Sequence, residues 1–139
     1  MKKYNDKSVL VIHYIDLNCD LGEYTNLDGE QKEREIMPAI TSANIACGGH
    51  TGDQRSMRRT ISLALEHAVA IGAHPSFVDR INFGRVEMDV PDKKLQEIIH
   101  RQISELMEHA AGFGGVEIQT LTIGLSQRHL AAQQQSIYA

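Results

Sequence analysis

The stretch that decides the fold is Ile40-Thr-Ser-Ala-Asn-Ile-Ala-Cys-Gly-Gly-His-Thr-Gly-Asp53. Its first part, residues 40–47, is short and apolar and predicts a buried strand, and the glycines that follow allow the chain to turn tightly. Apolar residues then recur at helical spacing over residues 57–68, which predicts a helix. Thr51, with Gln54 three residues later, has the form of a capping box that starts this helix. The stretch therefore predicts a strand, a loop and a helix in succession.

The same succession recurs along the chain. Strands are predicted at residues 9–18, 69–73 and 116–125, and helices at residues 33–40 and 91–112. The polar, glutamine-rich residues 126–139 are either helical or frayed. Strands that alternate with helices favour right-handed β-α-β units. We therefore predict an α/β fold with mainly parallel strands, in a single domain over residues 1–139.

The composition narrows the classes of protein. The chain has 139 residues, of which 42% are hydrophobic and 23% charged, as in soluble globular proteins. Eighteen acidic against fourteen basic residues give a net charge of -4, which argues against a nucleic acid partner. The sequence shows neither a signal-peptide core nor a long apolar run, so we expect a cytoplasmic protein with no membrane partner. Cys19 and Cys47 are expected to be buried thiols rather than a disulfide.

Polar residues gather where the predicted strands end. These polar residues lie in three loops, at residues 20–23, 50–53 and 74–85. Because ligand sites of parallel α/β sheets form at the carboxyl ends of the strands, the three loops should converge. The two imidazoles of His50 and His74, with Asp53 and with Asp20 or Glu23, can form a divalent-metal site or an acid-base site. Strand-end hydrogen bonding and helix capping are the structural alternative. The candidate catalytic residues are Asp20, His50, Asp53 and His74, and the candidate metal ligands are Asp20, His50 and His74.

Other polar groups near these loops have a functional and a structural interpretation. Arg80 and Arg85 flank Phe83-Gly84 and either clamp an anion or remain solvated charges. The glycine-rich loop that precedes His50 lacks the P-loop and dinucleotide-binding patterns, which leaves a tight turn as the simpler interpretation. Asn18 and Asn44 either orient a polar ligand or satisfy backbone groups.

Three motifs carry a resemblance to a known family. They are Asp16-Leu-Asn-Cys-Asp-Leu-Gly-Glu23, Ile36-Met-Pro-Ala-Ile-Thr-Ser-Ala-Asn-Ile-Ala-Cys-Gly48 and Ala70-Ile-Gly-Ala-His-Pro-Ser-Phe77. Together with Asp79-Arg80 and Phe83-Gly84-Arg85 they closely resemble the LamB/YcsF family. The resemblance covers roughly residues 14–110, within a family-like region that we place at residues 9–115.

The resemblance implies a fold and an activity. The fold is a β/α barrel related to carbohydrate deacetylases, of which this chain would supply the first half. The activity is the ATP-dependent opening of 5-oxo-L-proline to L-glutamate by 5-oxoprolinase, with ATP as cosubstrate and subunits B and C as partners. A divalent metal is a further candidate cofactor.

The family's polar positions can be carried onto this sequence one by one. Asp20 and His50 would then be bases or metal ligands, and His74 a second acid-base group. Asp53 and Glu23 would orient these three side chains, and the guanidinium of Arg85 would bind an anion. The residues expected to bind substrate or nucleotide are Asp16, Asn18, Glu23, Asn44, Asp79 and Arg85.

Two departures from the family pattern bear on function. Gly49 stands where the family usually has phenylalanine, so an aromatic wall is lost. The family's Lys-Pro-His-Gly-Ala-Leu-Tyr segment is not found in the divergent residues 116–139. Because a full β/α barrel needs about 250 residues, we expect a chain truncated after about residue 115, with an unpaired last strand, as a frameshifted or fragmentary gene would give.

Three interpretations follow for the function. The first is one component of the ATP-dependent 5-oxoprolinase. The second is a metal-dependent, deacetylase-like hydrolase of an amide or carbohydrate that needs no ATP. The third is an inactive fragment or assembly module that pairs with another chain, including a second copy of itself, through exposed apolar helix faces.

Overall fold

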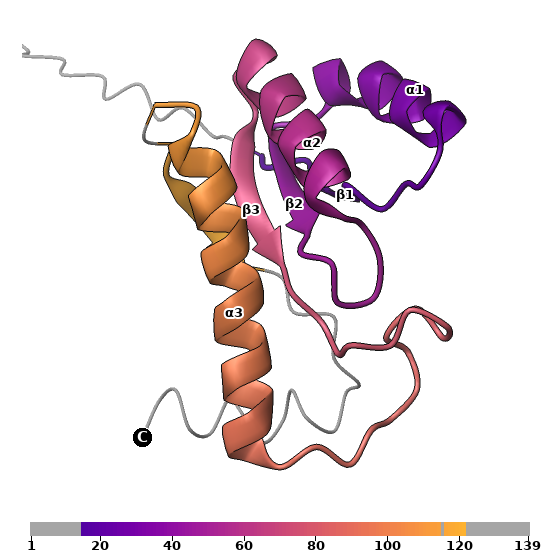
Figure 1. The fold of residues 1–139 in the computed structure, drawn as a ribbon. Coiled ribbons are helices and arrows are strands. Elements are labelled where there is room, and N and C mark those ends of the chain that lie inside the picture. Colours follow the sequence, from indigo (N-terminus) through magenta and orange to yellow (C-terminus); the bar gives the residue numbers. More distant parts are fainter. Residues whose placement is uncertain (1–14, 115, 122–139) are drawn as a thin grey trace, which may run out of the picture.

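The computed structural model describes residues 15–114 and 116–121, which form a four-stranded sheet covered by three helices (Figure 1). The strands pair in the order β1-β2-β3-β4, and every pairing is parallel. The strands are β1 (Asn18–Leu21), β2 (Ser42–Ala46), β3 (Ala70–His74) and β4 (Ile118–Leu121). The helices are α1 (Leu27–Ile36), α2 (Gln54–Glu66) and α3 (Asp92–Ala111). The predicted α/β class and the parallel sheet are confirmed.

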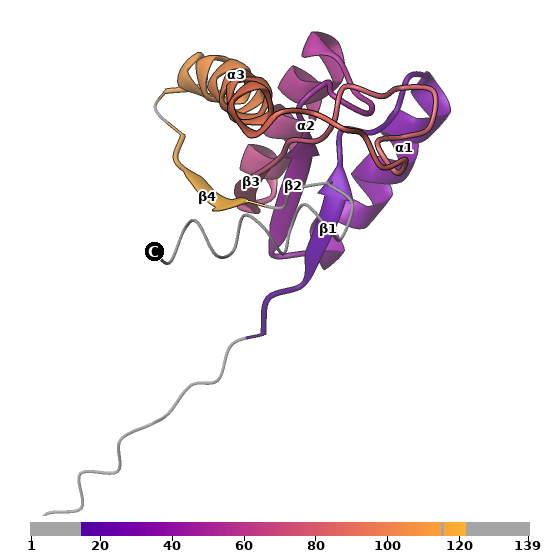
Figure 2. The same cartoon turned by 90° about the horizontal axis from the view of Figure 1, so that it is seen from below.

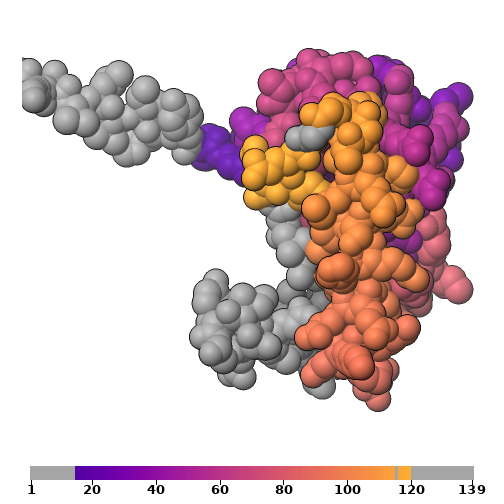
Figure 3. Space-filling view, turned by 60° about the vertical axis from the view of Figure 1, so that its left-hand side comes forward, coloured from indigo at the N-terminus to yellow at the C-terminus, as the bar shows by residue number. Residues whose placement is uncertain are grey.

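The order of the elements is that of a β/α barrel. Each helix connects one strand to the next, and the three helices lie on the same side of the sheet (Figure 2). A doubly wound sheet would instead reverse its strand order and carry helices on both faces. Among the described strands, β1 and β4 each pair with one neighbour, so the sheet is an open part of a barrel. Figure 3 shows α3 along one flank of the molecule, beside β4.

The two faces of the sheet differ in chemistry because alternate residues of a strand point to opposite sides. On the helix-facing side, Ala43, Ile45 and Ile71 join the core with residues of α2 and α3, such as Ile61 and Leu106. The other side carries polar groups in register. Asn18 pairs with Ser42, Asp20 with Asn44, and Ala46 with His74. The apolar pattern thus fixes which way the polar side chains point.

Two predicted element boundaries are wrong. The strand predicted at residues 9–18 instead begins at Asn18, and residues 15–17 precede it, while residues 9–14 lie outside the described part of the chain. Leu17 is held by Thr41, whose hydroxyl accepts from the Leu17 N–H at 2.8 Å. The helix predicted at residues 33–40 instead runs over Leu27–Ile36. Asn26 caps its first turn, and Pro38, which lacks an N–H, places a 3₁₀ turn after its end.

The predicted start of α2 is also wrong in detail. Asp53, not Thr51, caps the helix, because its side chain accepts from the Ser56 N–H and the Ser56 hydroxyl accepts from the Asp53 N–H, both at 2.8 Å. The Thr51 hydroxyl is engaged elsewhere and donates to the carbonyl of Glu23 at 3.1 Å. The third and fourth predicted strands are present as β3 and β4, although residues 122–139 lie outside the described part.

Both cysteines are free thiols, as predicted, but only Cys47 is fully buried and Cys19 is partly exposed. Burial raises the pKa of the Cys47 thiol to about 12, so this group stays protonated and unreactive at neutral pH. Within the described residues, none of the helices combines the length and the apolar character needed to span a bilayer.

Candidate active site at the carboxyl ends of the strands

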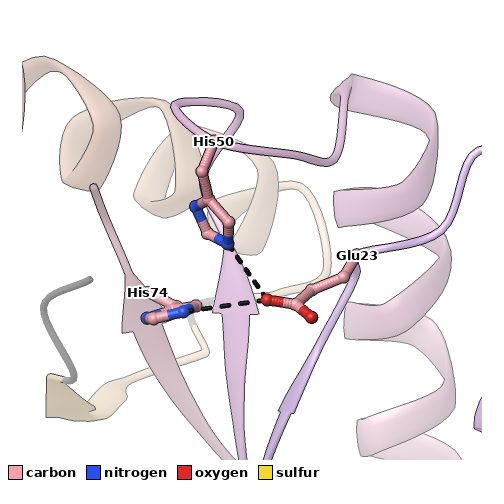
Figure 4. Close-up of side chains that lie close together, drawn as sticks. All are labelled: Glu23, His50 and His74. Atoms are coloured by element: carbon pink, nitrogen blue, oxygen red, sulfur yellow. Dashed lines mark hydrogen bonds and ion pairs between the residues drawn. The ribbon is translucent and has the colours of Figure 1, made fainter. Parts of the chain in front are cut away.

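Three side chains from three strand ends meet at one point. Glu23 follows β1, His50 lies in the loop after β2, and His74 is the last residue of β3. Glu23 Oε1 lies 3.0 Å from His50 Nε2 and 3.8 Å from His74 Nε2, and Figure 4 shows both imidazoles beside this one carboxylate oxygen. His50 is 3% exposed and His74 7%, whereas Glu23 is half-buried. The parallel sheet therefore builds a carboxylate-imidazole cluster that opens to solvent on the Glu23 side.

The ring of His50 is fixed by groups outside the cluster. Its Nδ1 lies 2.6 Å from the hydroxyl of Ser76, and this hydroxyl also donates to the carbonyl of Phe77 at 3.1 Å. Ser76 is held in turn by Gln102 of α3, whose Oε1 accepts from the Ser76 N–H at 3.1 Å and whose Nε2 donates to the Ser76 carbonyl at 2.7 Å. A chain of buried hydrogen bonds thus connects α3 to the imidazole.

The backbone that carries Glu23 is fixed by a buried carboxylate. Glu33 of α1 accepts from the backbone N–H groups of Gly22 and Glu23 and, at 2.7 Å, from the hydroxyl of Thr60 on α2. Burial raises the pKa of the Glu33 carboxyl above its ordinary value, and these hydrogen bonds offset part of that shift. Glu33 therefore connects two helices to the loop that presents Glu23.

Asp20 lies beside the cluster, on the polar face of the sheet. Its Oδ2 is 3.8 Å from His74 Nε2, and its side chain is 44% exposed. Asn44 donates from Nδ2 to Asp20 Oδ1 at 3.1 Å and to Asn18 Oδ1 at 2.6 Å, and Asn18 donates to the hydroxyl of Ser42 at 2.7 Å. The amide side chains thus orient Asp20 while its second oxygen remains next to the imidazole.

The same row of polar groups ends at Asp16. Its carboxylate accepts from the hydroxyls of Thr41 and Ser42, and these two hydrogen bonds lower the pKa of the Asp16 carboxyl. Asp16 therefore holds the start of β1 against the start of β2, at the opposite end of the strands from His74.

An aromatic side chain from the loop between β3 and α3 covers His50. The rings of Phe83 and His50 meet edge to face, with centroids 4.8 Å apart. Phe83 adopts a left-handed backbone conformation, with φ of 58°, to make this contact. The guanidinium of Arg85 lies 5.2 Å from the centroid of the Phe83 ring. Phe83 therefore provides an aromatic wall beside His50, although Gly49 carries no side chain.

The remaining predicted site residues have structural partners. The Asp53 carboxylate caps α2, and the Asp79 carboxylate accepts from the backbone and side chain of Asn82 in a turn. Arg80 donates to the carbonyls of Gly48 and Gly52 and so closes the loop that carries His50. The structure therefore brings Glu23, His50, His74 and Asp20 together, and uses Asp53 and Asp79 to shape the loops around them.

The comparison with known proteins identifies the family of the chain. Residues 15–135 match the family model described as LamB/YcsF family. The chain belongs to the LamB/YcsF family. The resemblance of the three motifs to this family is thereby confirmed, since the match includes all of them and the site residues.

Relatives and a solved structure show how much of the family protein is present. The chain is 46% identical over 103 residues to the second A subunit of 5-oxoprolinase from Pseudomonas putida, and 49% identical over 102 residues to the A subunit of 5-oxoprolinase from Geobacillus thermodenitrificans. These matches cover 74% and 73% of this chain but 40% of each relative. The crystal structure of a lactam utilization protein from Thermus thermophilus matches with a TM-score of 0.72 at 33% identity, over 80% of this chain and 44% of that one. The chain thus spans less than half the length of these family members.

Three residues that support the site are not among those predicted from the sequence. Gln102 interrupts an apolar stripe and faces the core between Leu95 and Leu106, which is the only local signal that it has a buried polar partner. Glu33 is likewise a buried acidic residue in an otherwise solvent-facing helix. Ser76 directly follows the strand-end pair His74-Pro75, a position that favours a site role but does not identify its partner.

Proposed function

We propose that this chain provides part of the A subunit of an ATP-dependent 5-oxoprolinase, which opens 5-oxo-L-proline to L-glutamate together with subunits B and C. The names of the relatives and of the lactam utilization protein support this substrate class. The observation that carries the proposal is the meeting of Glu23, His50 and His74 beside Asp20 at the carboxyl ends of the strands. Because the chain covers 40% of these relatives, the assembled activity is a proposal.

Hydrolysis of a lactam requires a base for the attacking water and an acid for the departing ring nitrogen. Asp20 is suited to be the base, since it is partly exposed and its Oδ1 is held by Asn44. Its carboxylate takes a proton from water as the water oxygen bonds to the carbonyl carbon. The protonated Asp20 carboxyl then delivers this proton to the ring nitrogen as the carbon–nitrogen bond breaks. His74, whose Nε2 lies 3.8 Å from Asp20 Oδ2, positions this carboxyl.

The carboxylate of 5-oxoproline needs a cationic partner near this point. Arg85 is the candidate, because its guanidinium rests on Phe83, which itself packs against His50. Guanidinium groups bind carboxylates through two parallel hydrogen bonds. Asn18 and Asn44 are proposed to bound the polar face of the sheet on which the lactam lies.

ATP supplies a phosphoryl group that can activate the lactam oxygen. The glycine-rich loop before α2 does not fit its phosphates, because the Asp53 carboxylate already occupies the helix N-terminus and accepts from Ser56. A cavity of about 410 Å³ beside this loop is lined by Arg80 and Arg101 but also by Asp53 and Glu105, so it offers no clear anion site. No step through ATP is therefore assigned to the described residues, and its use is proposed for the assembled enzyme.

The test is ATP-dependent release of glutamate from 5-oxoproline. The purified chain is mixed with subunits B and C, and the same mixture without this chain gives the background. A full-length relative serves as the positive control. Turnover above background is expected, and it should be lost with His74→Asn but kept with His100→Asn, which changes an exposed histidine of α3. Background turnover with an active positive control would contradict the proposal.

A second candidate function is hydrolysis of an amide or carbohydrate substrate by a metal-dependent, deacetylase-like mechanism without ATP. The cluster of two buried imidazoles and one carboxylate favours it, since such donors are common in metal-dependent hydrolases. The two functions differ in their requirements. Release of acetate from an N-acetylated sugar by the chain alone, without ATP or the other subunits, would support this second function.

A further inference from the structure

We propose that Glu23, His50 and His74 bind one divalent transition-metal ion of the zinc type, through Glu23 Oε1 and the Nε2 atoms of both imidazoles. This inference stands on the donor geometry and does not depend on which substrate the protein uses. Of the two carboxylates that the sequence offers beside these imidazoles, Asp20 and Glu23, the geometry selects Glu23 as the ligand.

The separations of the donor atoms fit a single ion. Ligands at about 2.0–2.2 Å from a tetrahedral ion lie about 3.3 Å from one another. The two separations from Glu23 Oε1, 3.0 Å to His50 and 3.8 Å to His74, bracket that value. All three donors lie within 4.8 Å of one another, so the His74 side of the cluster closes in when the three donors bind one centre.

The surroundings of His50 are those of a supported metal ligand. Its Nδ1 lies 2.6 Å from the hydroxyl of Ser76, which itself donates to the carbonyl of Phe77 at 3.1 Å. Its Nε2 lies 3.0 Å from Glu23 Oε1. An outer hydrogen-bond partner on one ring nitrogen is the usual support of an imidazole that binds a metal through the other nitrogen.

The burial of the cluster and its open side match a catalytic metal centre. The rings of His50 and His74 meet edge to face with centroids 4.8 Å apart, so both are held by packing before an ion arrives. Catalytic zinc sites use three protein ligands and keep one coordination position open. The partly exposed Asp20 carboxylate lies 3.8 Å from His74, beside that open side, and remains available as a base. Imidazole and carboxylate donors together favour zinc, cobalt or manganese over calcium.

The test measures metal binding directly on the complete, tag-free chain. The metal content is determined by elemental mass spectrometry, and the chelator-stripped protein is then titrated with Co²⁺, followed by its visible absorption, and competed with Zn²⁺. We expect about one ion per chain, as for a mononuclear site. Failure of the folded wild-type chain to bind either ion would overturn the proposal.

Variants locate the ion. His74→Asn should weaken Zn²⁺ binding by more than the roughly 10–100-fold typical of losing an outer partner, and Ser76→Ala should weaken it within that range. His100→Asn, on the exposed face of α3, should bind as the wild type does. If His74→Asn does not fold, Glu23→Gln carries the same comparison, because its side chain is half-buried. Equal affinities for the site variants and His100→Asn would overturn the proposal.

The outcomes separate the metal site from the proposed activity. Metal binding at Glu23, His50 and His74 without release of glutamate from 5-oxoproline would leave this site standing and contradict the lactam reaction. Glutamate release by a folded chain that binds no ion would support the lactam reaction and overturn the metal site. The chain's own residues are tested in both cases, since the metal measurement needs neither substrate nor the other subunits.

Discussion

Replacing Gln102 with leucine tests whether α3 holds the imidazole loop in place. The side chain makes two buried hydrogen bonds to one residue, accepting from the Ser76 N–H at 3.1 Å and donating to the Ser76 carbonyl at 2.7 Å. Leucine has a similar volume and can make neither bond. A buried backbone group left without a partner costs about 1–3 kcal/mol, so Gln102→Leu should lower the free energy of unfolding by about 2–6 kcal/mol. That is a large share of the about 5–15 kcal/mol typical of a domain.

The assay is urea unfolding followed by circular dichroism. For each variant, the slope of the free energy of unfolding against urea concentration is compared with that of the wild type. Gln96→Leu is the matched control, because it makes the same change on the exposed face of the same helix and should alter stability by no more than about 0.5 kcal/mol. The reasoning would be refuted if Gln102→Leu lost less than about 1 kcal/mol, below the cost of even one unsatisfied group. Equal losses in the two variants would refute it as well.

Three further substitutions probe the loops around the site. Asp53→Ala should lower the free energy of unfolding by about 1 kcal/mol through loss of the cap on α2, while Asp53→Asn should keep most of that stability in the same urea unfolding assay. Equal losses in the two variants would contradict the capping role. The raised pKa of Glu33 adds stability that is complete below its ordinary pKa of 4.5 and is lost as the pH rises through the raised value. Glu33→Gln should therefore gain stability relative to the wild type as the pH rises above 4.5, and parallel stability profiles in urea would contradict this. Gly49→Ala should cost about 1–3 kcal/mol, because its methyl group would lie 2.6 Å from the Ser76 hydroxyl; unchanged stability would show that the loop can shift freely.

The sequence predicted the fold where its signals were local. The apolar run before Gly48 and the spaced apolar residues after Asp53 identify β2 and α2, and the long stripe after Pro91 identifies α3. The boundaries were less accurate, because several residues can satisfy the same local rule. Thr51 and Asp53 both fit a helix cap, and the contact of Thr51 with Glu23, 28 residues away, decides between them.

The sequence predicts where the site lies, but it does not predict the buried hydrogen bonds that hold the site residues in place. The rule for parallel sheets brings residues of the first three strand ends together, and Glu23, His50 and His74 do meet there. The partners of these side chains depend on tertiary packing. Gln102 contacts Ser76 across 26 residues, and Glu33 contacts Thr60 across 27. Neither contact has a spacing rule that a single sequence could show.

The most direct test of the account compares two glutamate-to-glutamine variants in ATP-dependent glutamate release from 5-oxoproline, with subunits B and C present. Glu23→Gln changes the carboxylate that contacts both imidazoles, and Glu35→Gln makes the same change on the exposed surface of α1. We predict that Glu35→Gln keeps the wild-type rate and that Glu23→Gln lowers kcat by at least about 100-fold, the scale of misplacing a catalytic group, because Glu23 holds both imidazoles in position. A Glu23→Gln rate equal to that of the wild type, in a mixture that needs this chain for turnover, would contradict the account.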